Sequence, residues 1–210
     1  MHCGQIQTIR NLYRKTRGEP ARFFPENPTY PAYRGTTLRE MHVVVVGPVF
    51  PYRGGIPYCT TRLAAELARE FDVSIVSYSR QFPGWLYPGG SDRDESLRSK
   101  APAAARFELD VLNPLTWIAT AWRLRRQRPD AVIFVWWIWV WAIPYRVMMA
   151  LLGSSTRVIL QCHNIGDKEP AWWKRALTDL VLRRGDVLVV HARSEADDGW
   201  RRSGGRRTVK

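Results

Sequence analysis

Cysteine is scarce in this sequence, and the few that occur form no recognisable site. The three cysteines, at positions 3, 59 and 162, are scattered without the CxxC spacing of zinc or redox centres. This favours a reduced, cytoplasmic protein over a small secreted domain held together by disulfides. The N-terminal residues contain no apolar segment of the signal-peptide type, so we expect no secretory leader. The four histidines are equally dispersed, and we predict no metal site.

Two common nucleotide-binding motifs and a full-length membrane span are also missing. Neither GxGxxG nor a P-loop ending in Lys-Ser/Thr occurs, which argues against the dinucleotide-binding and P-loop enzymes. The most apolar run, Ala131–Trp141, is followed closely by Pro144 and Arg146, short of the roughly 20 residues that cross a bilayer. We therefore predict a buried strand over Ala131–Trp136 and a packed helix over Trp139–Leu152, with a transmembrane helix as the alternative.

The net charge of +13 is concentrated at the two ends of the chain. Residues 1–40 contribute +4 and residues 201–210 contribute +5, which leaves +4 for the 160 residues between them. This distribution gives no single basic stripe of the kind that follows nucleic acid, so we expect no nucleic-acid partner. Attraction to an anionic membrane surface or to anionic ligands stays open.

The most informative stretch, residues 41–71, predicts a strand, a glycine turn and a helix. The strand is expected over His42–Val46, because a short β-branched run suits a strand buried on both faces. Gly54 and Gly55 follow it and turn the chain into the helix. The predicted buried face of that helix consists of Leu63, Ala64, Leu67, Ala68 and Phe71. Such a turn places backbone N–H groups at the sheet edge where α/β proteins bind ligands, often phosphates.

Strands and helices then alternate along the chain. Further strands are predicted over Asp72–Tyr78, Arg106–Val111, Arg157–Cys162 and Val187–Val190, with a long loop over Ser79–Arg98. One helix begins at Pro114 behind an Asn113 cap, with Leu115, Ile118, Ala119 and Trp122 as its expected buried face. A second begins at Pro170, with Trp173, Ala176, Leu177, Leu180 and Val181 on one side, and Ser194 is a candidate cap for a third. This alternation predicts an α/β fold with a doubly wound, mostly parallel, Rossmann-like sheet.

We divide the chain into three parts. Residues 1–40 form a basic, proline-containing tail with little regular structure, or else precede a true start at Met41. Residues 41–200 form the Rossmann-like domain. Residues 201–210 are expected to begin a linker to a further domain.

Several segments, taken in order, resemble the N-terminal domain of family-four retaining glycosyltransferases of the GT-B fold. They are GPVFPYRGGIPYCTTRLAAELA, PDAVIFVWWIW, RVILQCHN and GDVLVVHARSEADD. The resemblance covers roughly residues 41–210 and implies one half of a GT-B architecture, the acceptor side. It also implies a C-terminal domain that binds the nucleotide-sugar donor through a pair of glutamates and that this sequence lacks. The enzyme activity of this chain alone is therefore uncertain, and we expect it to be inactive without that domain.

The same resemblance assigns roles to particular residues. Gly54 and Gly55 match the loop whose N–H groups approach the donor phosphates, although a tight turn explains the glycines equally well. Arg53 is a candidate phosphate partner. His163 matches the histidine at the donor–acceptor junction and is the expected catalytic residue, and Asn164 follows it as a hydrogen-bonding neighbour.

Other residues have weaker assignments. Tyr52 and Trp85 are candidate aromatic walls of the acceptor cleft. Asp167 and Glu169 lie in the loop after His163, but we assign neither as a nucleophile, because the donor's leaving phosphate is thought to take the acceptor proton in this family. Ser194 and Glu195 match the family's last strand-to-helix corner, where capping is the simpler role. The segment 172–175, Trp-Trp-Lys-Arg, is a candidate membrane-surface contact.

The sequence-based hypothesis is therefore an intact enzyme that transfers a sugar, with retention, from a nucleotide-sugar donor to a saccharide or lipid-linked acceptor. No cofactor is expected, since the nucleotide-sugar is a co-substrate. The protein would be cytoplasmic, or peripheral on the inner face of the membrane. Two alternatives stay open: a non-catalytic scaffold or partner subunit that completes a separate donor-binding chain, and a different α/β nucleotide-binding protein.

Overall fold

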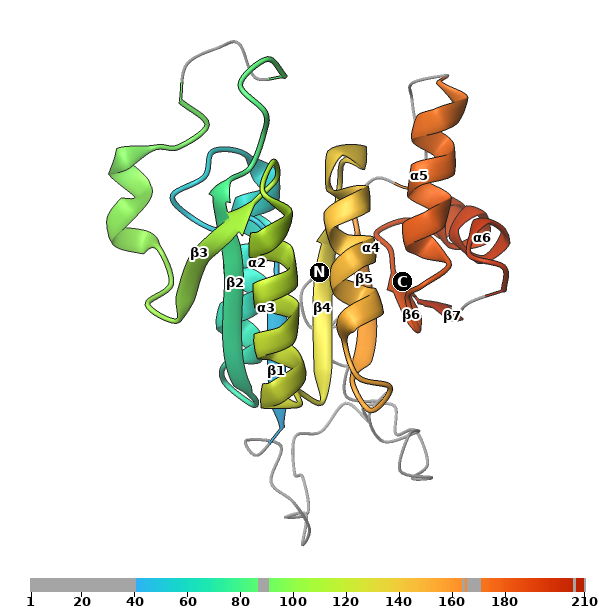
Figure 1. Cartoon of the computed structure of the whole chain (residues 1–210), viewed down its shortest axis with the longest axis horizontal. Coiled ribbons are helices and arrows are strands. Elements are labelled where there is room, and N and C mark those ends of the chain that lie inside the picture. The colour runs from blue at the N-terminus through green and yellow to red at the C-terminus, as the bar shows by residue number, and fades with distance from the viewer. Residues whose placement is uncertain (1–40, 87–90, 164, 166–170, 206, 210) are drawn as a thin grey trace, which may run out of the picture.

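The computed structural model of the chain describes residues 41–86, 91–163, 165, 171–205 and 207–209 (Figure 1). The predicted tail over residues 1–40 lies outside these described residues. The described part forms one seven-stranded sheet in the order β3-β2-β1-β4-β5-β6-β7. Every neighbouring pair in this sheet is parallel. In chain order the strands are β1 (His42–Val46), β2 (Asp72–Arg80), β3 (Ala105–Asp110), β4 (Ala131–Trp136), β5 (Arg157–Cys162), β6 (Val187–Val189) and β7 (Arg207–Val209).

Helices cover both faces of the sheet, which confirms the doubly wound α/β prediction. On one face lies α2 (Gly55–Leu67), and on the other lie α3 (Pro114–Gln127), α4 (Ala142–Leu151) and α5 (Trp172–Leu182). In Figure 1 the second group lies in front of the sheet and α2 lies behind it. The remaining elements are α6 (Arg193–Arg202) and two 3₁₀ turns, η2 (Glu95–Lys100) and η3 (Trp139–Trp141).

Strand β1 lies in the middle of the sheet because its side chains are apolar on both faces. Val43 and Val45 pack with α2, whereas Val44 and Val46 pack in the larger cluster beneath α3 and α4. All four valines are fully buried. Strand β4 is buried along its whole length in the same way. These continuous β-branched and aromatic runs are typical of central parallel strands.

The strand predictions and most of the face predicted for α2 agree with the structure, but the faces predicted for α3 and α5 do not. On α3 the expected face is solvent-exposed, with Leu115 at 73% and Trp122 at 51% of full exposure. The buried face consists of Trp117, Thr120, Ala121 and Leu124. Two of these are polar or carry a polar atom, and each finds a partner: the Trp117 indole N–H donates to the Asp110 carbonyl at 2.6 Å, and the Thr120 hydroxyl donates to Glu108 at 3.2 Å. Apolar residues on both sides of the helix made the sequence pattern ambiguous.

Smaller differences affect α2 and α5. Helix α2 ends at Leu67, so Ala68 is an exposed cap and Phe71 packs from beyond the helix. On α5 the buried residues are Thr178, Val181 and Leu182. Of the face predicted there, Val181 is buried, whereas Trp173, Ala176 and Leu180 are exposed and Leu177 is half-buried.

Element ends also differ from the prediction. The helix predicted over Trp139–Leu152 is divided into η3 and α4, which begins at Ala142 and ends at Leu151. The predicted loop over Ser79–Arg98 contains the last two residues of β2 and most of η2. Helix α5 begins at Trp172, and Pro170 lies outside the described residues. Helix α6 begins at Arg193 behind Ala192, so Ser194 is inside its first turn rather than its cap. Strand β7 pairs with β6, so the sheet extends into the segment expected to be a linker. Among the described residues, no helix is long and apolar enough to cross a membrane.

Candidate functional site

The candidate site lies at the carboxyl edge of the sheet, where the strand order reverses. The chain builds outward from β1 to β2 and β3, and then returns to place β4 on the other side of β1. In open α/β sheets the crevice at such a switch point is the usual ligand site. A cavity of about 190 Å³ occupies this position. Its lining residues follow β1, β2 and β4 and are Pro48, Arg53, Gly54, Gly55, Ile56, Pro57, Gln81, Phe82, Asp92 and Trp137.

Gly54 makes the turn that opens α2 towards the cavity. Its φ of 111° and ψ of 176° belong to a region that only glycine adopts without strain. It is the N-cap of α2 and offers no side-chain acceptor to the first turn. The N–H groups of Gly55 and Ile56 therefore have no partner within the helix, and Pro57 has no N–H. A Cβ added to Gly55 would meet no atom within 4 Å, so the backbone here is open to a ligand.

Arg53 lies beside the turn and is fastened to the segment that forms the opposite wall. Its backbone N–H donates to the Asp92 carbonyl at 2.9 Å, and its side-chain Nε–H donates to the Arg93 carbonyl at 3.0 Å. The guanidinium keeps its other N–H groups, and the residue is exposed. Arg53 therefore combines a held position with free donors beside the cavity.

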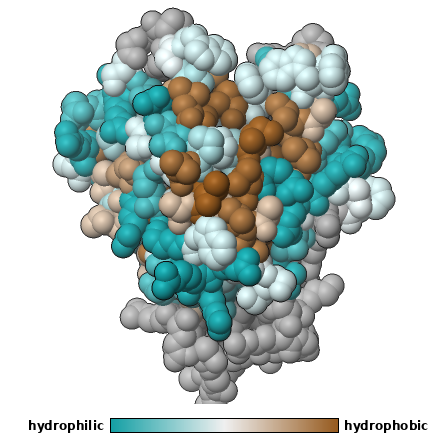
Figure 2. All heavy atoms as spheres, in the orientation of Figure 1, coloured by the Kyte–Doolittle hydropathy of each residue, from teal (hydrophilic) through white to brown (hydrophobic). Residues whose placement is uncertain are grey.

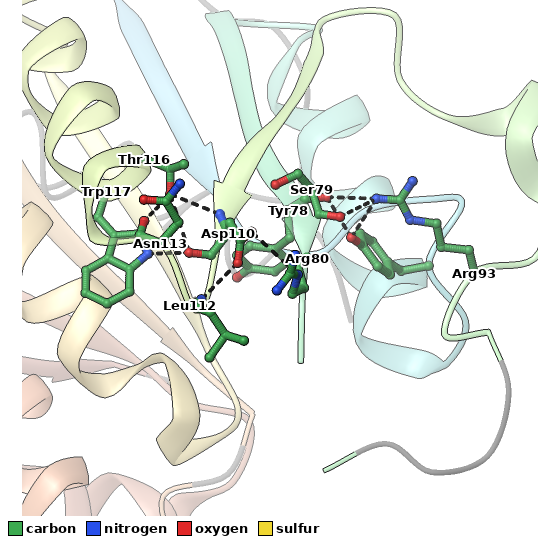
Figure 3. A network of polar contacts seen from close by, with 10 residues as sticks. Tyr78, Ser79, Arg80, Arg93, Asp110, Leu112, Asn113, Thr116 and Trp117 are labelled. Carbon is green, nitrogen blue, oxygen red and sulfur yellow. Dashed lines mark hydrogen bonds and ion pairs between the residues drawn. The ribbon is translucent and has the colours of Figure 1, made fainter. Parts of the chain in front are cut away.

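Arg93 in turn locks that wall onto the end of β2. One guanidinium nitrogen donates to the carbonyl of Ser79 at 2.9 Å, to that of Tyr78 at 3.3 Å and to the Tyr52 hydroxyl at 3.0 Å. Figure 3 shows Arg93 reaching from its loop to this strand end. The guanidinium also lies 5.0 Å from the centre of the Tyr52 ring. These contacts hold Asp92 against the glycine turn.

Tyr52 is buried and does not line the cavity, in contrast to the position we predicted for it. Its hydroxyl donates to the Tyr78 carbonyl at 2.6 Å, and its ring meets the Tyr78 ring edge-on. The Tyr78 hydroxyl in turn forms a hydrogen bond with the Tyr145 hydroxyl at 2.5 Å. Burial raises the pKa of the Tyr52 phenol above its usual value, so the group stays protonated as a donor. Trp85, the other predicted cleft aromatic, is exposed on a turn and lies outside the cavity lining.

His163 follows β5 at the same edge of the sheet, one strand beyond β4. Its backbone N–H donates to the Trp136 carbonyl at 2.8 Å, and its ring lies 4.6 Å from the ring of His191. Its Nε2 is buried without a hydrogen-bond partner among the described residues. Burial, and then the nearby His191, lower the pKa of the His163 imidazole to about 4. The ring is therefore neutral near pH 7 and can accept or donate one hydrogen bond.

The remaining predicted residues divide into two groups. Asn164, Asp167 and Glu169 lie outside the described residues. Glu195 is described, and its carboxylate accepts the backbone N–H of His191 at 3.3 Å, which steadies the turn after β6. Among the residues that the structure describes, no group of three or more His, Cys, Asp or Glu side chains is placed to hold a metal ion.

Sequence reasoning missed several residues of this edge. Gln81 directly follows β2 and Trp137 directly follows β4, and both line the cavity. His191 follows β6 closely and its ring lies tilted against that of His163, although we had considered it only when excluding a metal site. All three could have been found by one signal, because the ends of neighbouring parallel strands meet at one edge. Asp92 gave no such signal, since it reaches the cavity through the irregular segment before η2.

The comparison with solved structures finds a similar architecture in another protein. The lipopolysaccharide outer core galactosyltransferase WaaB in its apo form has a similar structure, with a TM-score of 0.52 and 10% identity over 81% of this chain and 45% of that one. Two others align less well, at TM-scores of 0.48 and 0.44. One is the UDP-N-acetylglucosamine 2-epimerase from Rickettsia bellii, with 11% identity over 80% of this chain and 44% of that one. The other is Glycyrrhiza uralensis UGT73P12 complexed with glycyrrhetinic acid 3-O-monoglucuronide, with 8% identity over 80% of this chain and 48% of that one.

The chain therefore spans less than half the length of these proteins, and the likeness to WaaB indicates a shared fold. A comparison of the sequence with curated proteins gave no match. The profile of the glycosyl transferase 4-like domain matches residues 54–209, which include the glycine turn and all strands from β2 to β7. The chain thus belongs to the glycosyl transferase 4-like family.

Proposed function

We propose that this glycosyltransferase-like domain is the acceptor side of an enzyme that transfers a sugar, with retention, from a nucleotide-sugar to a hydroxyl group. One observation carries the proposal: the Gly54–Gly55 turn and the N-terminus of α2 open on a cavity at the switch point of the sheet. Unpaired N–H groups and the positive end of a helix stabilise phosphate oxygens. A diphosphate is the charged part of a nucleotide-sugar, so this turn is suited to the donor.

The proposed roles follow from the positions of the side chains. Gly54 and Gly55 contact the donor phosphates through the backbone, and Arg53 offers its guanidinium to the same charge. His163, neutral near pH 7, hydrogen-bonds a sugar hydroxyl at the reacting centre. Its buried and unpartnered Nε2 supports this role, because a buried ring nitrogen is costly to leave unpaired. No side chain is assigned as a covalent nucleophile and no metal is required. The hydrogen-bonding role of Asn164 stays a prediction, because the residue lies outside the described residues.

A second domain is part of the proposal. Small-molecule sites usually enclose about 300–1,000 Å³, whereas the cavity here measures about 190 Å³. A half-formed site of this size is expected of one wall of a two-domain cleft. The other wall would belong either to the same polypeptide or to a separate donor-binding chain, in which case this chain would act as a partner subunit. The acceptor is a saccharide or a lipid-linked saccharide, and the latter implies a position at the inner face of the membrane.

The test begins with the DNA downstream of the Lys210 codon. A reading frame that encodes a second Rossmann domain with a glutamate pair supplies the missing wall, fused or separate. The complete protein should then transfer sugar from a UDP- or GDP-sugar, and Gly55→Ala should reduce transfer strongly without loss of stability. Transfer by the 210-residue chain alone at the rate of the complete protein would refute the two-wall proposal. Tight binding of ATP or a dinucleotide to this chain would instead favour a different nucleotide-binding function.

A further inference from the structure

One face of the molecule exposes large apolar side chains on the outer side of α3 and α4. We call it the α3–α4 face and define it by Leu112, Leu115, Ile118, Trp122 and Ile143, which are between 38% and 73% exposed. Figure 2 shows apolar surface gathered in the middle of this side of the molecule, where α3 and α4 lie in Figure 1. An exposed apolar patch of this kind marks a binding surface.

The charged side chains on the two helices of this face are all positive. Helix α3 carries three arginines and no acid, its cap Arg128 adds a fourth, and α4 carries one arginine and no acid. Arg123 pairs with Glu108, but Arg125, Arg126 and Arg128 are exposed and make no ion pair within the part of the chain that the structure describes. The Arg125 guanidinium lies over the Trp122 ring at 5.5 Å. The apolar face is therefore bordered by cations that reach beyond it.

The opposite face of the sheet provides an internal comparison. Helix α2 carries one arginine and one glutamate, Arg62 and Glu66. Its only exposed large apolar side chain among the described residues is Tyr58. The α3–α4 face therefore exposes more large apolar side chains than α2 does, and its two helices carry an excess of positive charge that α2 lacks.

We propose that the α3–α4 face docks on an anionic lipid bilayer. Apolar side chains insert among the acyl chains, a tryptophan lies at the headgroup level, and arginines contact lipid phosphates, which is how amphipathic helices bind membrane surfaces. A second copy of this chain is a poorer occupant. A two-fold interface places the same patch on both sides, so the arginines of α3 and α4 would face those of the partner. The inference goes beyond sugar transfer and does not depend on it.

Docking in this way has a consequence for the candidate site. Leu112 and Leu115 flank the start of α3, directly after β3, and the cavity lies beyond the ends of β1, β2 and β4. Since parallel strands end at one edge, the leading end of α3 and the cavity share that edge. The bilayer would therefore lie beside the cavity mouth. Trp172 is also exposed at the start of α5 on this side of the sheet. Residues 172–175, which the sequence marked as a candidate membrane contact, would therefore lie at the margin of a surface centred on α3.

The experiment is sedimentation of the full 210-residue chain with vesicles. One set contains phosphatidylcholine alone, and the other contains phosphatidylcholine with about one-third phosphatidylglycerol. We expect binding to the anionic vesicles that weakens with salt, and little binding to the neutral ones. Leu115→Ser should weaken binding about tenfold through lost apolar contact. Arg126→Glu should weaken it about tenfold or more through the reversed charge.

Matched controls lie on α2. Tyr58→Ser and Arg62→Glu remove an exposed apolar group and reverse an exposed charge on the other face, and both should bind vesicles like the original chain. The Tm should be the same for Arg126→Glu and Arg62→Glu. Arg126→Glu therefore tests docking even if Leu115→Ser loses stability. The proposal is overturned if neither vesicle type binds the chain, or if the α2 variants lose binding instead. It is also overturned if Leu115→Ser dissociates a dimer in sedimentation equilibrium while no vesicles are bound.

Discussion

Replacing Gly54 with alanine should destabilise the protein, whereas the same replacement at Gly55 should not. The backbone of Gly54 has a φ of 111° and a ψ of 176°, where an L-residue is strained by about 1–3 kcal/mol. Space is not the obstacle, because the nearest atom to an added Cβ is the Pro57 Cδ at 4.0 Å. The cost is therefore conformational and should be about 2 kcal/mol, which corresponds to about 4–8 °C in Tm for a protein of this size.

Gly55 is the matched control, because it is the next residue and begins α2. Its φ is not in the left-handed region, and an added Cβ meets nothing within 4 Å. Alanine also favours a helix over glycine by up to about 1 kcal/mol. The free energy of unfolding of Gly55→Ala should therefore equal or slightly exceed that of the original chain.

The assay is urea unfolding of the three proteins under one buffer condition, read by circular dichroism. Equal stability of Gly54→Ala and the original chain would refute the conformational argument, and so would an equal loss in both variants. A second readout separates folding from function. If the turn contacts donor phosphates, Gly55→Ala reduces sugar transfer by the complete enzyme although its stability is unchanged, since its methyl group occupies the space where the phosphate approaches.

Three further predictions test the packing and the charges around the site. Gly47→Ala places a Cβ 2.7 Å from the Val135 Cγ2, which should cost about 1–3 kcal/mol in thermal unfolding, and adding Val135→Ala should recover part of that loss. Arg93→Ala removes two hydrogen bonds to the end of β2 and one to the Tyr52 hydroxyl, so it should cost about 1–3 kcal/mol and speed proteolysis near Asp92, unlike the exposed control Arg98→Ala. The His163 pKa of about 4 lies below the ordinary value of 6.5, so the folded protein binds fewer protons between these pH values. Its free energy of unfolding should therefore fall by about 2 kcal/mol between pH 7 and pH 4.5 relative to His163→Gln, measured by urea unfolding; equal pH profiles would exclude a buried neutral ring.

The strands could be predicted from the sequence because their burial leaves a simple record. Val43–Val46 and Ala131–Trp136 are apolar at every position, as is typical of a strand covered on both faces. The buried side of α3 left no such record. Its apolar residues lie on two sides, and its true contact face includes Thr120, whose hydroxyl is satisfied only by a partner on β3. Such pairings depend on tertiary contacts, which periodicity does not contain.

The candidate site was predictable to a similar degree. The glycine turn can be recognised from the sequence, because Gly54 and Gly55 lie between a predicted strand and a predicted helix. The order of the strands in the sheet then places this turn at the switch point. The burial of Tyr52 could not be predicted from the sequence, because an aromatic residue beside a glycine turn suits a cleft wall and a buried position equally well. Its burial follows from the Arg93 contact, which joins residues 41 positions apart. The contact between the rings of His163 and His191 likewise requires that β5 and β6 be neighbours.

The central position of β1 has a consequence for how the chain folds. One edge of β1 pairs with β2, which follows it closely in the sequence. The other edge pairs with β4, which is synthesised much later. The hydrogen bond from the His42 backbone N–H to the Asp130 carboxylate there joins residues 88 positions apart. Closing so large a loop costs entropy before any apolar contact rewards it. Until Ala131–Trp136 has left the ribosome, one edge of β1 keeps unpaired backbone N–H and C=O groups beside four exposed valine side chains, and this edge can pair with other chains. The sequence feature that makes the centre of the sheet stable in the finished protein therefore also makes its nascent chain prone to aggregation.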